Sequence, residues 1–243
     1  MSSEWTNPTS VSPGVMARQL ALLRARGYVG FTLSELVSRG AEGTLPKRSL
    51  AVTFDDGYAS TVNAKPVLDD VGYPATVFVV TDFVESGELL SWPGIEQWRT
   101  GAQSRELASL RQADLELLTE AGWEIGSHTR THPSLPTLNR EQLADEIGGS
   151  REELIRRLGR CDTLAYPYGL TSAAAIDVVE SSGYSAACVV RPRKGEQGRF
   201  CVPRIGLYGN DTGLRLRAKL SPRVYAVSRH RTRALRGGAG DAV

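Results

Sequence analysis

The chain of 243 residues is poor in cysteine and has no long hydrophobic run. Its three cysteines, Cys161, Cys188 and Cys201, are widely spaced and include no C-x-x-C pair, which argues against a disulfide framework and a cysteine zinc site. We expect reduced, mostly buried thiols. No stretch of about 18 apolar residues occurs, and residues 1–30 lack the pattern of a signal peptide. These absences predict a soluble chain in the cytoplasm.

Glycine-rich phosphate signatures are also missing. No G-x-G-x-x-G follows a predicted strand, and no G-x-x-x-x-G-K-[ST] occurs. The formal net charge of +2 is too small to predict a nucleic-acid partner. The sequence therefore argues against nucleotide-binding and nucleic-acid-binding functions.

Basic residues are concentrated near the C-terminus. Residues 212–240 contain eight basic residues and no acidic one, so the rest of the chain has 21 basic against 27 acidic residues. We expect residues 1–211 to form one domain, followed by a basic C-terminal helix and a disordered tail over residues 212–243. Such a segment suits peripheral contact with an anionic membrane surface, and a purely solubilising role is the alternative.

Short β-type runs alternate with helical patterns along the chain. This alternation is typical of parallel strands covered by helices, either closed as a barrel or left as an open doubly wound sheet, and periodicity does not choose between the two. Residues 82–112 interrupt it and are expected to form an irregular insertion. Strands are predicted at 28–33, 50–55, 75–80, 123–127, 163–167, 185–190 and 200–207. Helices are predicted at 15–25, 33–38, 60–71, 114–121, 140–158 and 171–182.

Two adjacent carboxylates end the second predicted strand, which is apolar up to Phe54 and continues as Asp55, Asp56 and Gly57. The C-terminal ends of parallel strands are where α/β folds gather their active-site groups. Neighbouring side chains of an extended chain point in opposite directions, so both carboxylates reach one site only if the chain bends, as Gly57 permits. A turn that caps a helix is the alternative interpretation.

Two of the three histidines follow the strand predicted at 123–127. His128 and His132 are four residues apart, which places both imidazoles on one side of a turn or tight loop, and Pro133 favours a loop. Neutral imidazole is the commonest nitrogen ligand of Zn²⁺. Two histidines hydrogen-bonded to the backbone are the alternative.

One carboxylate and two histidines provide three protein ligands, the usual number for a catalytic metal that keeps one position open for water. The second carboxylate is then available as a base. A divalent metal lowers the pKa of its water to about 7 and polarises a carbonyl group, so that an amide or ester is hydrolysed at neutral pH. The combination predicts metal-assisted deacylation.

A third cluster, Tyr166-Pro167-Tyr168-Gly169, ends another predicted strand. A turn of this kind can direct a backbone N–H group toward the metal as an oxyanion donor, and tyrosine rings offer flat faces that suit sugar rings. Packing at the end of the strand is the alternative.

Taken in order, residues 53–57 (TFDDG), 128–133 (HTRTHP) and 166–169 (YPYG) resemble the first three motifs of the polysaccharide deacetylases. This family is also called the NodB-homology domain or carbohydrate esterase family 4. The resemblance covers residues 15–207 and is closest in style to the poly-N-acetylglucosamine deacetylases and the enzymes of exopolysaccharide synthesis.

The resemblance implies an α/β fold, a single domain that forms a distorted (β/α)7-type barrel of mostly parallel strands. It also implies one divalent metal ion bound by Asp56, His128 and His132, with Zn²⁺ expected and Co²⁺ or Ni²⁺ as alternatives. Asp55 would be the general base, and the backbone N–H group of Tyr168 would stabilise the oxyanion.

The resemblance further implies a substrate and a reaction. Tyr166, Pro167 and Tyr168 are expected to bind an N-acetylated, or less often O-acetylated, polysaccharide or oligosaccharide. Water would attack the acetyl carbonyl and release acetate. A glycan-binding member that has lost turnover and an acetyl-xylan-type O-deacetylase are the alternative functions.

The chain departs from the family pattern at two points. Ala165 stands where an arginine commonly orients the base, and Arg204 is a candidate replacement by position, with a surface arginine as the alternative. The late histidine that commonly acts as general acid is missing from residues 205–209, and His230 lies in the basic tail. We therefore expect Asp55 to pass the proton taken from water to the leaving amine.

Overall fold

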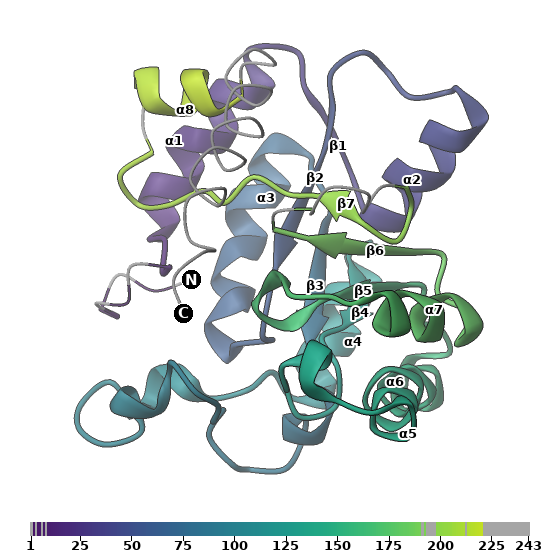
Figure 1. Ribbon diagram of the computed structural model, residues 1–243. Helices are drawn as coiled ribbons and strands as arrows, with labels where there is room; N and C mark the ends of the chain where they lie inside the picture. The colour runs from purple at the N-terminus through teal and green to yellow at the C-terminus, as the bar shows by residue number, and fades with distance from the viewer. Residues whose placement is uncertain are drawn as a thin grey trace, which may run out of the picture.

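Seven short strands form one parallel sheet in the computed structural model (Figure 1). The structure describes residues 2, 4, 5, 7, 9–190, 192, 198–211 and 213–220. All seven predicted strands are present, most of them shorter than expected. They are β1 (Val29–Phe31), β2 (Ser49–Phe54), β3 (Ala75–Val79), β4 (Glu124–Ser127), β5 (Thr163–Ala165), β6 (Ala186–Val189) and β7 (Val202–Pro203).

The strands follow one another in chain order, and each neighbouring pair is parallel. Strands β1 and β7 are the two edges, and no pairing joins them within the described residues. The sheet is therefore a half-barrel that is open between β1 and β7. This arrangement confirms the predicted single-domain (β/α)7-type fold in its distorted, open form.

Helices surround the half-barrel, and every helical stretch predicted from the sequence contains one (Figure 1). The stretch 140–158 differs from a plain α-helix, because a π-helical segment separates its two α-helical parts. The α-helices are α1 (Pro13–Arg24), α2 (Leu33–Glu42), α3 (Lys65–Val71), α4 (Gln112–Glu120), α5 (Arg140–Leu143), α6 (Ser150–Leu158), α7 (Ala173–Ser181) and α8 (Gly213–Lys219). The π-helix is η6 (Ala144–Gly149), and the 3-10 helices are η1 (Ala59–Ala64), η2 (Thr81–Phe83), η3 (Glu96–Trp98), η4 (Ser104–Leu107), η5 (Leu135–Thr137) and η7 (Pro167–Gly169).

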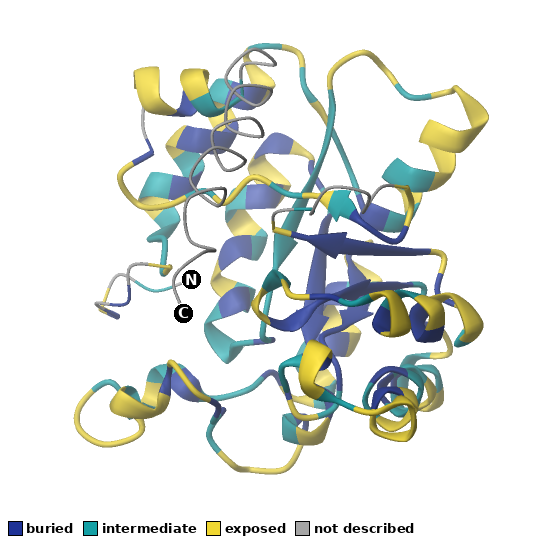
Figure 2. Cartoon of the chain, in the orientation of Figure 1, coloured by how far each residue is buried: buried dark blue, intermediate teal, exposed yellow. Residues whose placement is uncertain are grey.

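Side chains of the central strands alternate between two apolar layers, as the period of two in a strand requires. Phe78 packs with Ala165 and Cys188 in a small cluster inside the half-barrel. Its neighbours Val77 and Val79 belong instead to the main core between the sheet and the helices. Strands β3 to β6 are buried along their whole length, whereas the helices expose their outer faces (Figure 2). The buried strands form a rigid frame for the loops that follow them.

A buried carboxylate lies inside the half-barrel at the N-terminal end of β4. Glu124 accepts hydrogen bonds from the backbone N–H group of Ser34 (3.0 Å) and from the hydroxyls of Thr76 (2.9 Å) and Thr163 (2.8 Å). Ser34 is in the first turn of α2, where the helix dipole favours a negative charge. Glu124 thus joins α2, β3 and β5 at this end of the fold.

Residues 82–112 form the irregular insertion that the sequence predicts, with three short 3-10 helices and two isolated β-bridges, made by Ala108 and Ser109. A second apolar cluster holds it against the sheet through Leu90, Trp92, Ile95 and Leu107. Val80, directly after β3, and Trp5 from the N-terminal segment are the other buried members of this cluster. The insertion is therefore packed onto the rim where the strands end.

The basic C-terminal segment is described only as far as residue 220. Helix α8 buries Leu216, and its Lys219 pairs with the buried Asp211. The rest of the tail, including His230, lies outside the described residues, so the disordered end, the membrane contact and the cytoplasmic location stay predictions. Among the described helices, none has the length and apolar character to cross a bilayer.

The three cysteines are free and buried, as the sequence predicts. Burial raises the pKa of Cys161 and of Cys188 to about 12. These two thiols are therefore protonated at neutral pH and are poor nucleophiles and metal ligands.

Candidate active site

The candidate site is built at the C-terminal ends of the strands, on one rim of the half-barrel. Asp55 and Asp56 follow β2, and His128 follows β4. Tyr168 lies just beyond β5 and Arg204 just beyond β7. Parallel strands bring these positions together although they are up to 149 residues apart in the chain.

The chain bends after β2 as predicted. Asp56 and Gly57 both have left-handed backbone angles, with φ of 71° and 72°. A Cβ atom at Gly57 would lie 2.9 Å from Cγ1 of Val79, so a larger residue does not fit there. This turn lets the carboxylates of Asp55 and Asp56 reach the same site.

Asp56, His128 and His132 form a compact group of potential metal ligands. Oδ1 of Asp56 lies 3.4 Å from Nε2 of His128 and 3.5 Å from Nε2 of His132. One ligand atom from each residue lies within 4.8 Å of the other two. Both histidines are buried, and Asp56 is partly exposed. The structure therefore brings together the three residues predicted as metal ligands.

The donor set fits a divalent ion such as Zn²⁺. Nδ1 of His128 lies 2.7 Å from the carbonyl oxygen of Ala165, which fixes the proton of the neutral ring on Nδ1 and leaves the lone pair on Nε2 facing Asp56. Nδ1 of His132 is buried without a hydrogen-bond partner among the described residues. Two imidazole nitrogens and one carboxylate oxygen are a common ligand set of catalytic zinc.

The electrostatic environment separates the two histidines. Burial, followed by the nearby His128, lowers the pKa of His132 to about 4. Burial also opposes the protonation of His128, but its hydrogen bond to Asp56 and the charges of Asp55 and Asp56 raise the pKa of this ring. His132 is therefore neutral at physiological pH, which is the form that binds a metal.

Asp55 is bound by Arg204, as the position of this arginine in the sequence suggested. The guanidinium donates two hydrogen bonds to the carboxylate, at 2.6 Å and 2.8 Å, and a third to the hydroxyl of Thr53 at 3.2 Å. Burial alone would raise the pKa of Asp55, but the charge and hydrogen bonds of Arg204 outweigh it and lower the pKa to about 2. The predicted replacement for the arginine missing at Ala165 is confirmed, and the surface-arginine alternative is wrong.

Aromatic rings enclose the histidine side of the site. Trp92 of the insertion stacks on His132 with ring centroids 4.2 Å apart, and Tyr168 meets the same imidazole edge-on at 4.6 Å. The hydroxyl of Tyr168 donates to the carbonyl oxygen of Pro93 at 3.4 Å. Trp92 is buried, whereas 43% of Tyr168 is exposed. Tyr168 therefore offers a ring face to solvent directly beside His132.

Two of the three residues predicted to bind the substrate are buried in the structure. The side chain of Tyr166 is fully buried in the main core, and its hydroxyl donates to the carbonyl oxygen of Phe200 at 3.1 Å. Pro167 is buried as well. Tyr166 and Pro167 shape the turn that presents Tyr168, which has a left-handed φ of 57°, and only Tyr168 remains a candidate for substrate contact.

Sequence reasoning gave no role to Tyr58. Its hydroxyl donates a hydrogen bond to Asp56, and its ring packs edge-on against Trp5 with centroids 5.0 Å apart. Burial, followed by the nearby carboxylates, raises the pKa of Tyr58 far above its ordinary value. Its place directly after Asp-Asp-Gly was visible in the sequence, but the direction of its side chain was not.

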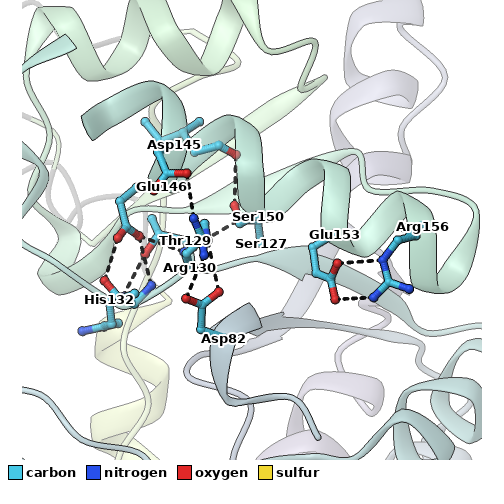
Figure 3. A network of polar contacts seen from close by, with 12 residues as sticks. Asp82, Ser127, Thr129, Arg130, His132, Asp145, Glu146, Ser150, Glu153 and Arg156 are labelled. Carbon is cyan, nitrogen blue, oxygen red and sulfur yellow. Dashed lines mark hydrogen bonds and ion pairs between the residues drawn. The ribbon is translucent and has the colours of Figure 1, made fainter. Parts of the chain in front are cut away.

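A second group of residues that the sequence did not reveal contacts the loop 128–132, which carries both histidines. Figure 3 shows Glu146 and Ser150 reaching from the helical segment 140–158 toward the loop that carries His132. Arg130 of the loop pairs on its outer side with Asp82 and Asp145. No motif spacing marks Glu146, because it is one of several acidic residues on a helix.

Comparisons with known proteins agree with this geometry. The sequence profile of the polysaccharide deacetylase family matches residues 42–187. A poly-beta-1,6-N-acetyl-D-glucosamine N-deacetylase of Staphylococcus epidermidis is 27% identical over 214 residues, which cover 83% of this chain and 69% of the relative. The protein of the same name from Staphylococcus aureus is 26% identical over 220 residues, covering 84% of this chain and 70% of the relative.

Solved structures share the fold. The deacetylase PplD of Streptococcus pyogenes, in complex with acetate, superposes with a TM-score of 0.76 at 22% identity, covering 91% of this chain and 93% of that one. IcaB of Ammonifex degensii gives a TM-score of 0.69 at 22% identity, with 87% and 88% covered. With the family profile matching more than half of the sequence, this chain belongs to the polysaccharide deacetylase family.

Proposed function

We propose that the protein is a metal-dependent hydrolase that removes acetyl groups from N-acetylated amino sugars of a polysaccharide. The observation that carries the proposal is the group of Asp56, His128 and His132 with the ionised Asp55 beside it, bound by Arg204. The relatives named poly-beta-1,6-N-acetyl-D-glucosamine N-deacetylase support a β-1,6-linked N-acetylglucosamine polymer as the substrate.

Asp56, His128 and His132 would hold one divalent ion, with Zn²⁺ expected and Co²⁺ or Ni²⁺ as alternatives. When bound, such an ion polarises the acetyl carbonyl and lowers the pKa of a water molecule. The exposed face of Tyr168 is suited to pack against a sugar ring, and its backbone N–H group is the expected oxyanion donor.

Asp55 would act as the general base. Its low pKa keeps the carboxylate ionised at neutral pH, and Arg204 fixes the direction of both oxygens. The carboxylate accepts the proton of the attacking water while the new C–O bond forms. The same proton then passes to the nitrogen as the C–N bond breaks, so that acetate and a free amine leave. This double role replaces the histidine that is missing from residues 205–209.

An unsupported Asp55, without an arginine at position 165, would favour the glycan-binding alternative. Arg204 supplies the contact to Asp55 that this arginine would make, so the arrangement favours turnover over binding alone. An O-deacetylase remains the alternative within the enzyme class.

Acetate release from β-1,6-linked N-acetylglucosamine oligomers tests the proposal. We expect turnover with Zn²⁺, Co²⁺ or Ni²⁺, no turnover with a chelator, and a fall of roughly 10²- to 10⁴-fold in Asp55→Asn. Asp69→Asn, which removes an exposed carboxylate on α3, is the matched control and should retain activity. Oligomer binding in calorimetry without acetate release would favour the glycan-binding alternative, and release only from acetyl-xylan would favour an O-deacetylase.

A further inference from the structure

The loop that carries the two histidines has an unfavourable backbone conformation. Thr129 and His132 are both left-handed, with φ of 69° and 65°, in a region that residues other than glycine seldom adopt. A loop of this shape persists only where its surroundings determine it. The contacts that hold this loop therefore also determine the position of His132 relative to Asp56.

The backbone N–H groups of residues 129–132 show where the support comes from. None of these four groups donates to a backbone carbonyl in the bonds that the structure gives them, and a side-chain oxygen accepts each one. The four bonds are Thr129 N to Ser127 Oγ (3.0 Å), Arg130 N to Glu146 Oε2 (2.9 Å), Thr131 N to Glu146 Oε2 (3.0 Å) and His132 N to Thr129 Oγ1 (3.1 Å).

Glu146 contributes more of these contacts than any other side chain. Besides the two N–H groups, it accepts a hydrogen bond from the hydroxyl of Thr131 on Oε1 at 2.6 Å. One carboxylate thus holds two successive residues of the loop through three hydrogen bonds. Glu146 is half-buried, which limits competition from water.

The helical segment that contacts the loop departs from α-helical geometry at Glu146. Glu146 lies within the π-helical segment η6, and π-helical turns are rare and frequent at functional sites. Ser150, four residues later, contacts the hydroxyl of Ser127 at 2.6 Å, and Ser127 accepts the N–H group of Thr129. The same helical face therefore supports the beginning of the loop through Ser150 and its middle through Glu146.

We propose that Glu146 is a positioning residue for the metal site. By holding Arg130 and Thr131 in place, its carboxylate fixes the turn that directs His132 toward Asp56. This inference rests on the proposed function, because it gives Glu146 a role in binding the metal ion. The exposed Asp145 beside it pairs with the Arg130 side chain at 2.7 Å, and such surface pairs contribute little.

Zinc affinity of the full chain, measured by competition with a chromophoric chelator, tests the proposal. Glu146→Ala should bind Zn²⁺ about 10- to 100-fold more weakly, as is typical when a partner outside the ligand set is lost. Asp145→Ala should match the wild type. Glu146→Gln should fall between the wild type and the alanine variant, because its amide oxygen can still accept both N–H groups. Equal affinities of Glu146→Ala and the wild type, or equal losses in Glu146→Ala and Asp145→Ala, would overturn the proposal.

Amide hydrogen exchange of the metal-free protein provides a second readout. Exchange at residues 130 and 131 should be faster in Glu146→Ala than in the wild type and unchanged in Asp145→Ala. The exchange measurement separates the proposed function from the positioning role of Glu146. A wild type that binds no zinc would contradict the proposed function, whereas hydrogen exchange would still show whether Glu146 holds the loop. If Glu146→Ala does not fold, Thr131→Val removes only the 2.6 Å bond, and unchanged zinc affinity in that variant would refute the positioning role.

Discussion

Two carboxylates lie at opposite ends of the half-barrel and are held in different ways. Glu124, at the N-terminal end of β4, accepts hydrogen bonds only from neutral donors of α2, β3 and β5 among the contacts that the structure gives it. Asp55, at the C-terminal end of β2, accepts two hydrogen bonds from the positively charged guanidinium of Arg204. The first arrangement joins elements of the fold, and the second directs a carboxylate toward a site that is open to solvent.

Backbone strain is also distributed unequally between the two ends of the half-barrel. Five non-glycine residues have positive φ in the described part of the chain, and four of them, Asp56, Thr129, His132 and Tyr168, lie at the C-terminal rim. His132 also has a buried nitrogen without a partner there. Strain and unsatisfied groups persist where function requires them. Changes at the Glu124 end should therefore lower stability, whereas changes at the Asp55 end should lower activity or metal binding.

The largest expected effect is on stability, in Glu124→Ala. Removing this carboxylate leaves the Ser34 N–H group and the hydroxyls of Thr76 and Thr163 without their acceptor in the interior. The free energy of unfolding should fall by about 3–5 kcal/mol in urea denaturation. Acetate release per folded molecule should stay near the wild-type level.

Glu42→Ala, on the exposed end of the same helix α2, is the control for the Glu124 variant. Its carboxylate accepts an exposed hydrogen bond from Ser38, so the change in stability should stay within about 0.5 kcal/mol. A Glu124→Ala protein that is as stable as this control, or one that is fully stable but inactive, would break the proposed division between the two ends.

The next effect is on catalysis, in Arg204→Met. Without the guanidinium, Asp55 loses two hydrogen bonds that orient its carboxylate, and kcat should fall by about 10²-fold with little change in KM. Arg204→Lys keeps the charge but cannot form the two-pronged contact, so its kcat should lie between those of the wild type and the methionine variant. Steady-state kinetics on the oligomer substrate measure both. Wild-type kcat in Arg204→Met would show that the pairing has no role in turnover.

The strand–helix alternation made most of the fold predictable from the sequence. Apolar runs such as 75–80 are buried on both faces, and their pattern marks a strand whether the sheet is open or closed. The same pattern holds no information on whether β1 and β7 meet, because that depends on contacts across the whole barrel. The π-helical segment at 144–149 was also beyond prediction, since it interrupts a stretch whose apolar spacing is ordinary for an α-helix.

The site was predictable where local sequence determines geometry. Asp55, Asp56, His128 and His132 each follow a strand, so parallel pairing places them on one rim. The burial of Tyr166 was not predictable, because the sequence does not show where the alternation along β5 gives way to a turn. The ring of Tyr166 continues into the core. Contacts made across the fold, such as that of Glu146 with Thr131, depend on how a helix docks and leave no spacing signal.

The smallest expected effect concerns a single hydroxyl, in Tyr58→Phe. The ring should stay packed against Trp5, while Asp56 loses the hydrogen bond that restrains its carboxylate. Zinc affinity in chelator competition should weaken about tenfold, the lower end of what loss of such a partner costs. Tyr73→Phe is the matched control, because its hydroxyl donates to the carbonyl oxygen of Tyr28 (2.7 Å), away from the rim. That variant should lose about 1 kcal/mol of stability and no zinc affinity. Equal zinc affinities in the two variants would mean that the rim tolerates loss of this contact and that Asp56 is held by the bend at Gly57 alone.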